Sequence, residues 1–321
     1  MKRRFWKTAL FAVLIAVVIC IAGGCGSSAT SDKTAGNSIR TLTDSKGNTV
    51  KVSEKPQRIV SMMLDADEIL MDLVSPSRIA ALTYLSDDPG ISHISERSKQ
   101  IKNRIKGQNA EQILALKPDL VLIPDFWSPT VLQTLRDMKI PVYVYKTPYT
   151  IEAVKSTMKE IAGVVGETQR GNELNRELEK RLAKLQDKLV KIQSLPPRKV
   201  IAITGAGAYG TKGSLYDDMC LFLHINNCQR DLKLDKSTMI PKELIVQANP
   251  DIIIVPSWNS PGMHKVQEIK ELLEDPSLKS VNAVKTKNIK AIPGQSLYCI
   301  NHYIADSMEL LAKTVYPEHF K

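Results

Sequence analysis

Two stretches of this chain repeat one another at a fixed distance. The segment EQILALKPDLVLIPDFW (111–127) aligns with ELIVQANPDIIIVPSWN (243–259) at a constant offset of 132. The alignment pairs Glu111 with Glu243, Pro118-Asp119 with Pro250-Asp251 and Pro124 with Pro256, and it puts Trp127 one position from Trp258. Several matches in one register favour two lobes of similar topology over a chance coincidence.

The stretch between the two copies has the pattern of one long helix. From Glu167 to Gln193 there is no Pro, and the only Gly, Gly171, lies near the start. Apolar residues recur at steps of four and three, which puts them on one helical face: Leu174, Leu178, Leu182, Leu185, Leu189 and Ile192. At about 1.5 Å of rise per residue the helix is roughly 40 Å long, about the width of a domain. We interpret it as a stiff connector between two lobes. The alternative is one more amphipathic helix packed on a single domain.

Strands alternate with helices on both sides of this stretch, which predicts parallel sheets covered on both faces. Before the long helix we expect strands over 58–62, 78–83, 120–123 and 140–145, and helices over 67–73 (with Asp65 as its cap), 110–116, 130–138 and 150–165. After it we expect strands over 199–204, 252–255 and 289–292, and helices over 214–223, 241–248 and 303–314. Residues 41–55 predict a hairpin that turns at Lys46-Gly47-Asn48. The expected fold class is α/β.

The N-terminal residues have the pattern of an export signal. Lys2, Arg3, Arg4 and Lys7 precede an apolar run from Ala9 to Ala22, and small residues then lead to Cys25. This arrangement indicates a signal peptide over 1–24, and its small-small-Cys ending resembles a bacterial lipoprotein box. Cys25 is then the lipidation site, and residues 25–40 tether the chain flexibly to the outer face of the cell membrane. The alternative is an uncleaved N-terminal anchor, although the apolar run is short for a span of ~20 residues.

Charge and cysteine content argue against several classes of function. Removal of the signal peptide lowers the formal net charge from +10 to +6, and no cationic stripe interleaved with aromatic residues indicates nucleic-acid binding. An odd number of cysteines, Cys220, Cys228 and Cys299, remains beyond Cys25, so at least one thiol is unpaired, whereas Cys220 and Cys228 could pair or stay free. The scattered histidines do not have the spacing of a zinc site. The loop GAGAYG (205–210) lacks the full dinucleotide-binding pattern, and no nucleophile-and-base set is found.

The order of the segments is similar to that of a known family. The stretches RIVSMMLDADEIL, QNAEQILALKPDLVLI, GTKGSLYDDM and PKELIVQANPDIIIV, with the long helix in the middle, resemble the helical-linker substrate-binding proteins of ABC importers. That family includes iron-siderophore, haem and cobalamin binders. The resemblance implies two Rossmann-like lobes, 41–166 and 195–321, joined by a connecting helix over 167–194, with the ligand cleft between the lobes. Because one rigid helix links the lobes, we expect only slight closure on ligand.

Glu111 and Glu243 occupy equivalent helix starts, one on each lobe. An acidic residue in the first turn is favoured by the helix dipole, so helix stabilisation is the simplest interpretation. The resemblance implies more, because in that family an exposed glutamate on each lobe pairs with arginines of the membrane permease. Contacts between arginine and carboxylate suit docking that is both oriented and reversible. We therefore predict that Glu111 and Glu243 are permease-docking residues.

Aromatic and polar residues fall on the loops that follow the predicted strands. Ligands of open α/β sheets bind outside the carboxyl ends of the strands, where aromatic side chains can stack on them. The candidate ligand-binding residues are Met63, Tyr84, Trp127, Tyr209, Trp258, Tyr298 and His302. Tyr84 is favoured because its TYLSDDP setting resembles the first-lobe ligand loop of the family. The alternatives are ordinary loop packing for the aromatic residues, a core position for Met63 and a structural role for His302.

These features predict a binding protein rather than an enzyme. The expected function is a lipid-anchored substrate-binding protein that delivers an iron complex, siderophore or haem, to an ABC importer. We expect a monomer without a cofactor or a direct metal site, whose partners are a metal-chelate small molecule, the permease and the membrane. The alternatives are a cobalamin or other corrinoid ligand, an exported enzyme on a nitrogenase-like two-lobe fold, and a signalling partner that binds without transport. The absence of a catalytic set and of cluster-binding cysteines argues against the enzyme.

Overall fold

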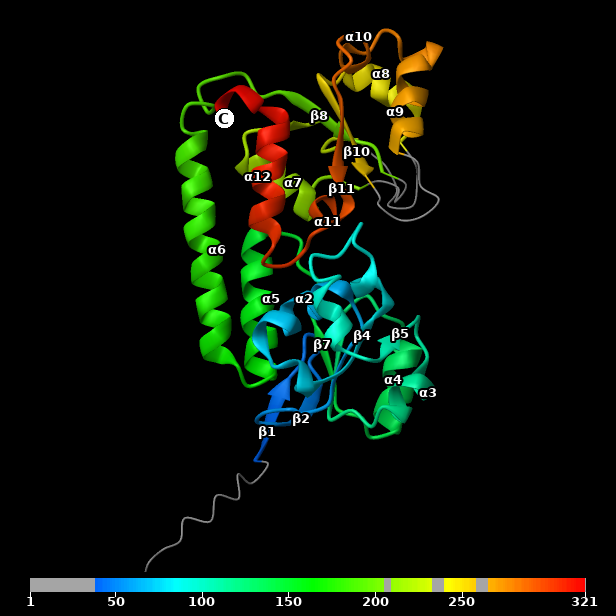
Figure 1. Cartoon of the computed structure of the whole chain (residues 1–321), viewed down its shortest axis with the longest axis vertical. Helices are drawn as coiled ribbons and strands as arrows, with labels where there is room; N and C mark the ends of the chain where they lie inside the picture. Colours follow the sequence, from blue (N-terminus) through cyan, green and yellow to red (C-terminus); the bar gives the residue numbers. More distant parts are fainter. Residues whose placement is uncertain (1–37, 205–208, 233–239, 258–264, 321) are drawn as a thin grey trace, which may run out of the picture. The chain divides into compact units, whose positions relative to one another are not determined.

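Two parallel sheets, one before and one after a long helix in the sequence, organise the chain, and the helix runs along one side of the molecule (Figure 1). The computed structural model describes residues 38–204, 209–232, 240–257 and 265–320, which belong to one compact unit. The predictions for the signal peptide, Cys25 and Trp258 lie outside these residues. The predicted hairpin is present as β1 (Ile39–Thr43) and β2 (Thr49–Ser53). Its turn is stabilised by the Asp44 carboxylate, which accepts the backbone N–H groups of Lys46 and Asn48 at 2.9 and 2.8 Å.

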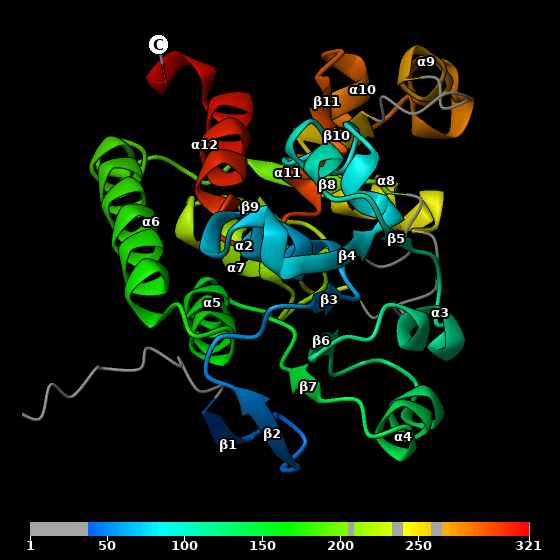
Figure 2. The same ribbon diagram turned by 60° about the horizontal axis from the view of Figure 1, so that its bottom comes forward.

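The N-terminal lobe is built on a five-stranded sheet in the order β5-β4-β3-β6-β7, with parallel pairing throughout. The side chains of the central strands point alternately to the two faces of the sheet. They pack against α2 and α5 on one face and against α3 and α4 on the other (Figure 2). The strands are β3 (Ile59–Ser61), β4 (Ile79–Thr83), β5 (Arg104–Ile105), β6 (Leu120–Pro124) and β7 (Val142–Tyr145). The helices are α2 (Leu64–Leu73), α3 (Ala110–Ala115), α4 (Pro129–Asp137) and α5 (Ile151–Val164), with 3₁₀ turns at Pro76–Arg78, Tyr84–Asp87 and Arg97–Gln100.

The C-terminal lobe is built on a four-stranded parallel sheet in the order β11-β10-β8-β9. One face packs against α7 and α12, and the other against α8 and α10. The strands are β8 (Lys199–Ala202), β9 (Asn226–Asn227), β10 (Ile252–Ser257) and β11 (Ile289–Pro293). The helices are α7 (Leu215–Phe222), α8 (Lys242–Ala248), α9 (Lys265–Glu274), α10 (Asn282–Lys285), α11 (Gly294–Leu297) and α12 (Ile304–Val315), with 3₁₀ turns at Pro276–Leu278 and Pro317–His319.

The long connector is α6 (Thr168–Leu189), and its apolar face is shared between the lobes. Leu174 packs in the N-terminal core, whereas the leucines from Leu178 to Leu189 pack in the C-terminal core. Helix α5 lies beside α6 and divides its buried residues between the same two cores (Figure 1). A Cβ atom on Gly171 would lie 2.3 Å from the Ala162 Cβ, so only glycine permits this close approach. The predicted two-lobe fold is confirmed, and the structure adds α5 to the connection between the lobes.

The internal repeat has the same structural role in both lobes. Helices α3 and α8 begin 132 residues apart, as do strands β6 and β10. The Asp119 carboxylate accepts the backbone N–H of Arg58 at 2.8 Å, and the Asp251 carboxylate accepts that of Lys199 at 3.0 Å. In each lobe, therefore, the aspartate before β6 or β10 bonds to the backbone at the start of the neighbouring strand, β3 or β8. This shared contact explains why the two aspartates recur.

The predicted strands and helices are all present, with ends that differ by a few residues. The predicted cap of α2 is wrong, because Met63 is the N-cap residue and Asp65 lies in the first turn. The Asp65 carboxylate instead accepts the hydroxyl of Tyr145 at 2.8 Å inside the lobe. The two-residue strands β5 and β9 and the helices α9, α10 and α11 were not predicted. Strands β5 and β9 and helices α10 and α11 have only two to four residues, too few for periodicity to be informative. Helix α9 has ten residues, as many as α2, so length does not explain why it was missed.

Candidate functional site

The carboxyl ends of the two sheets meet across the boundary between the lobes. Gln295, two residues after β11, donates its backbone N–H to Gly90 O, in the loop after β4, at 2.8 Å. Asn301 of the C-terminal lobe donates its side-chain amide to the buried Glu68 carboxylate of α2. Because ligands of open α/β sheets bind outside the carboxyl ends of the strands, this boundary is the candidate ligand cleft. Residues 205–208 and 258–264, which follow β8 and β10 in the sequence, lie outside the described residues.

Two predicted ligand residues of the N-terminal lobe lie at strand ends with part of their surface accessible. Met63 follows β3 and is partly buried at the start of α2. Tyr84 follows β4 and is 49% exposed. We define the Tyr84 loop as residues 84–92, from the end of β4 to the segment that meets the C-terminal lobe. Tyr84 therefore has an accessible ring on a loop at the lobe boundary.

Trp127 differs from Tyr84, because its ring is buried in the core beneath α3 and α4 and only 9% exposed. Its neighbour Phe126 is 58% exposed. Both residues follow β6, so the loop does carry an accessible aromatic ring at the strand end. The sequence did not single out Phe126, although the alternation of buried and exposed residues after a strand is a signal that could have found it.

Tyr209 and Tyr298 are brought together in the C-terminal lobe. Their ring centroids lie 5.3 Å apart in an edge-to-face arrangement, and Tyr209 also lies 5.1 Å from Tyr216. The Tyr209 hydroxyl donates to Leu297 O. Burial raises the pKa of Tyr209 well above its ordinary value, so the phenol stays neutral. The rings of Tyr209 and Tyr298 form an aromatic cluster next to α11.

His302 bonds across the lobe boundary. Its Nε2 lies 2.7 Å from the Asp72 Oδ2 on α2, and its ring packs against Tyr303 with centroids 4.3 Å apart. The Asp72 carboxylate also accepts the Tyr303 hydroxyl at 2.7 Å and pairs with Arg97 at 2.8 Å. Burial alone would raise the pKa of Asp72, but the hydrogen bonds from His302, Tyr303 and Arg97 hold it below its usual range. The Nε2 atom of His302 is thus hydrogen-bonded to the opposite lobe, which favours the structural role for this histidine.

A second polar contact joins the lobes one helical turn away from Asp72. The Glu68 carboxylate, whose residue is 2% exposed, accepts the Asn301 amide and the backbone N–H of His93, the latter at 2.6 Å. The His93 ring stacks on Tyr303 with centroids 4.5 Å apart. This cluster was not predicted, because Glu68 and Asn301 are 233 positions apart in the sequence. The acidic residues at positions 68 and 72 of a buried helix were the available signal, since buried charges require partners.

A buried carboxyl group lies beneath the Tyr84 loop. Asp67 is 0% exposed and accepts the backbone N–H and the hydroxyl of Thr83, at 3.1 and 2.5 Å from Oδ2. Burial raises the pKa of Asp67 to about 8, and the hydrogen bonds from Thr83 and Ser61 oppose this shift. The carboxyl group thereby ties the end of β4 to the first turn of α2.

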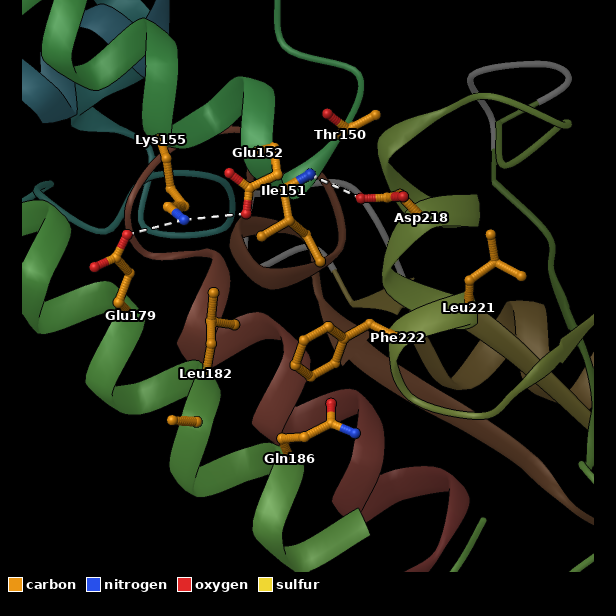
Figure 3. Close-up of a pocket in the computed structure, with 11 residues that line it drawn as sticks. Thr150, Ile151, Glu152, Lys155, Glu179, Leu182, Gln186, Asp218, Leu221 and Phe222 are labelled. Atoms are coloured by element: carbon orange, nitrogen blue, oxygen red, sulfur yellow. Dashed lines mark hydrogen bonds and ion pairs between the residues drawn. The ribbon is translucent and has the colours of Figure 1, made fainter. Parts of the chain in front are cut away.

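An open groove of about 680 Å³ lies where α5, α6 and α7 meet (Figure 3). The Asp218 carboxylate accepts the backbone N–H of Ile151 at 2.8 Å. The Lys155 ammonium bridges Glu152 and Glu179 at 3.0 and 2.9 Å. The charged groups of the groove are therefore all paired within it. We interpret the groove as part of the junction between the lobes and the connecting helices rather than as the ligand cleft.

Glu111 and Glu243 lie at matching places on the two lobes. Each occupies the first turn of its helix, α3 or α8, and each is exposed. Helix α3 is capped by the Asn109 side chain, which accepts the backbone N–H of Gln112 at 3.0 Å. Beside Glu243, Lys242 forms an ion pair with Asp275 at 2.5 Å. The two glutamates thus present equivalent accessible carboxylates, one on each lobe.

The remaining features concern metals, membranes and thiols. Within the described ranges, no group of three or more His, Cys, Asp or Glu side chains gathers as metal ligands. Among the helices of residues 38–320 that the structure describes, none is long and apolar enough to cross a membrane.

The cysteines Cys220, Cys228 and Cys299 are free thiols, so Cys220 and Cys228 do not form a disulfide. Burial raises the pKa of the Cys228 thiol to about 11.

Two parallel-sheet lobes that are linked by a long helix and meet at their strand ends define a two-lobed α/β protein. The chain belongs to the periplasmic binding protein family, whose model matches residues 59–296.

Comparison with individual proteins supports the same class. The chain is 24% identical to YvrC, an uncharacterized ABC transporter substrate-binding lipoprotein of Bacillus subtilis, over the whole of both chains. It is 24% identical to YfiY, a probable siderophore-binding lipoprotein of the same organism, over 56% of this chain and 55% of that one. It is 22% identical to a cobalamin-binding protein of Halobacterium salinarum, over 66% of this chain and 57% of that protein. Among solved structures, the haem-binding protein RhuT of Roseiflexus sp. RS-1 has a TM-score of 0.70 and 22% identity, covering 82% of this chain and 99% of RhuT.

Proposed function

We propose that this protein is the substrate-binding lipoprotein of an ABC importer and that it captures an iron complex, either a siderophore or haem. The observation that carries the proposal is the meeting of two sets of parallel-strand ends across the lobe boundary in a chain of the periplasmic binding protein family. The relatives named for siderophore and haem binding support an iron complex. Accessible aromatic side chains, Tyr84 and Phe126, suit the flat or aromatic groups of such ligands.

Capture is expected to need little movement of the lobes. The Glu68–Asn301 and Asp72–His302 contacts join the lobes beside the cleft in the ligand-free chain. A charge-assisted hydrogen bond of this kind contributes about 1.5–3 kcal/mol when it is buried. Opening the lobes would break both contacts, so we infer that the cleft is largely preformed.

The ligand-binding residues that we retain are Met63, Tyr84, Tyr209, Trp258 and Tyr298, with Phe126 in place of Trp127 as the exposed ring of its loop. His302 is assigned a structural role, because its Nε2 is bonded to Asp72. The metal ion is held by the chelate in this proposal, and the protein recognises the organic surface of the complex.

Delivery is proposed to use Glu111 and Glu243. The exposed carboxylates lie on equivalent helices of the two lobes, so a permease with two arginine-bearing surfaces can contact both at once. Cys25 is the proposed lipid attachment site, which keeps the chain outside the cytoplasm near the permease. A monomer bound to one ligand is the expected working unit.

The docking assignment is tested by charge reversal. The double variant Glu111→Lys and Glu243→Lys should abolish ligand uptake into cells, because each new ammonium faces an arginine, while the affinity of the purified protein for ligand stays unchanged. The matched control reverses two exposed glutamates elsewhere, Glu177→Lys and Glu274→Lys, and should leave uptake intact. An equal loss of ligand affinity in the first double variant, or full uptake by it, would contradict the docking assignment.

The alternative ligand within this class is cobalamin or another corrinoid, which the relative from Halobacterium salinarum favours. A corrinoid is larger than haem and has polar side arms. Titration with haemin, a ferric hydroxamate siderophore and cyanocobalamin distinguishes the two proposals. Tight binding of cyanocobalamin alone would replace the iron complex as the ligand and leave the transport function in place.

A further inference from the structure

The beginning of the Tyr84 loop is fixed to the N-terminal lobe. Thr83, the residue before the loop, donates its backbone N–H and its hydroxyl to the Asp67 carboxyl group, at 3.1 and 2.5 Å from Oδ2. Four residues further on, Asp87 forms an ion pair with Arg104 of β5 at 2.6 Å. Both anchors belong to the sheet and helices of the N-terminal lobe.

The far end of the Tyr84 loop is held by the C-terminal lobe through Gln295. The backbone N–H of Gln295 donates to Gly90 O at 2.8 Å. In the orientation that satisfies its side-chain amide, the Gln295 nitrogen lies 3.0 Å from Pro89 O and 3.2 Å from Ser92 O. Gln295 belongs to α11, which follows β11 directly. One residue of the C-terminal lobe therefore contacts three carbonyl groups of a single turn.

The turn between these anchors is internally bonded. Ser86 donates its hydroxyl to Thr83 O at 2.7 Å. The Asp88 carboxylate accepts the backbone N–H of Gly90 at 2.7 Å, and Asp88 O accepts that of Ser92 at 2.9 Å. The backbone N–H of Asp88 also donates to Leu85 O at 3.2 Å, so the far end of the loop is bonded to the turn that carries Tyr84.

We propose that Gln295 is a positioning residue that couples the C-terminal lobe to Tyr84. Gln295 holds the far end of the Tyr84 loop against the C-terminal lobe, so the turn that carries the ring is fixed relative to both lobes when a ligand occupies the cleft. The effect on ligand binding rests on the proposed function. The coupling itself is a property of the ligand-free chain and is measured without a ligand.

Amide hydrogen exchange in the ligand-free protein tests the coupling. Gln295→Glu keeps the shape of the side chain but replaces its N–H donors by a carboxylate that faces two carbonyl oxygens. Gln295→Ala removes the donors without this repulsion. Loss of two hydrogen bonds should raise exchange in the peptide 84–92 by roughly tenfold or more, with Gln295→Glu above Gln295→Ala. Gln133→Ala, on the exposed surface of α4, is the matched control and should leave the peptide unchanged.

Two results would overturn the coupling. One is equal exchange of the peptide 84–92 in wild type and both Gln295 variants. The other is a rise spread evenly over both lobes, which would show general destabilisation instead of a local tie. A thermal unfolding midpoint within a few degrees of wild type should accompany the expected local increase.

A second measurement connects the coupling to ligand binding. For whichever of haemin, ferric hydroxamate or cyanocobalamin binds wild type, Gln295→Glu should raise the dissociation rate about tenfold and leave the association rate nearly unchanged. Increased exchange with an unchanged dissociation rate would retain the tie but refute its role in binding. Failure of all three probes to bind wild type would refute the proposed ligand classes, and the exchange result would still decide the coupling.

Discussion

Replacing Asp67 by Asn should change how the free energy of unfolding depends on pH. Burial raises the pKa of this fully buried carboxyl group to about 8 in the folded chain, against the lowering effect of hydrogen bonds from Thr83 and Ser61. In the unfolded chain the same group loses its proton near pH 4, as an ordinary aspartate does. Between these two pH values the folded state holds the extra proton, so stability falls as pH rises.

The size of the stability change follows from the pH range between the pKa values of Asp67 in the unfolded and folded chain. One proton difference changes the free energy of unfolding by at most about 1.4 kcal/mol per pH unit. Asp65, whose pKa burial raises to about 6, adds to the slope only between about pH 4 and 6. Asp67 should therefore dominate between pH 6 and 8 and account for a loss of about 2–3 kcal/mol there.

Urea unfolding at pH 6, 7 and 8 provides the assay. The Asp67→Asn variant keeps an acceptor for Thr83 but has no proton to lose, so its stability should change little over this range while wild type loses stability. Asp65→Asn is the control and should retain the wild-type slope above pH 6. Parallel curves for wild type and Asp67→Asn from pH 6 to 8 would refute the buried neutral acid.

Three further predictions follow from packing and charge. Gly171→Ala should lower the free energy of unfolding by about 1–3 kcal/mol, because its Cβ would lie 2.3 Å from the Ala162 Cβ; Gly163→Ala, which meets nothing within 4 Å, should raise it by about 0.5–1 kcal/mol in the same denaturant titration. The folded-state pKa of Asp72 is lowered, so the stability that this carboxylate contributes to the folded chain is present above about pH 4 and lost on further acidification. In acid titrations followed by circular dichroism, Asp72→Asn should be less stable than wild type at pH 6 and should lose less stability below pH 4. With a pKa of about 11 against an ordinary 9.0, the Cys228 thiol should react with a disulfide reagent roughly a hundredfold more slowly in the native protein than in urea, and equal rates would contradict its burial.

The sequence predicted those parts of the fold that depend on local pattern and on repetition. The leucine spacing identified α6, and the 132-residue offset correctly placed α3 with β6 and α8 with β10 in equivalent positions. It could not show that Leu174 packs in one lobe and Leu178 onward in the other, because the helical face is continuous in the sequence. The role of Gly171 was also hidden, since the close approach of α5 depends on tertiary packing.

The candidate site was less predictable than the fold. Tyr84 was predicted from its place after a strand and its TYLSDDP setting, and its role in ligand binding stays a prediction. Trp127 was predicted by the same strand-end rule, although its residue is buried in the core. The contacts of Glu68 with Asn301 and of Asp72 with His302 join positions about 230 apart. Such pairs depend on how two lobes meet, and no local pattern encodes that orientation. The capping residue of α2 was mistaken for a similar reason, because Asp65 bonds to Tyr145 of a distant strand.

The most direct test of the central claim is an equilibrium titration of the purified protein, followed by intrinsic tryptophan fluorescence. Haemin, a ferric hydroxamate siderophore and cyanocobalamin are added separately. We expect saturable binding of one ligand per chain, with a Kd of about 1 μM or tighter for an iron complex. Absence of saturable binding for all three ligands, or chemical turnover of a ligand without tight binding, would contradict it.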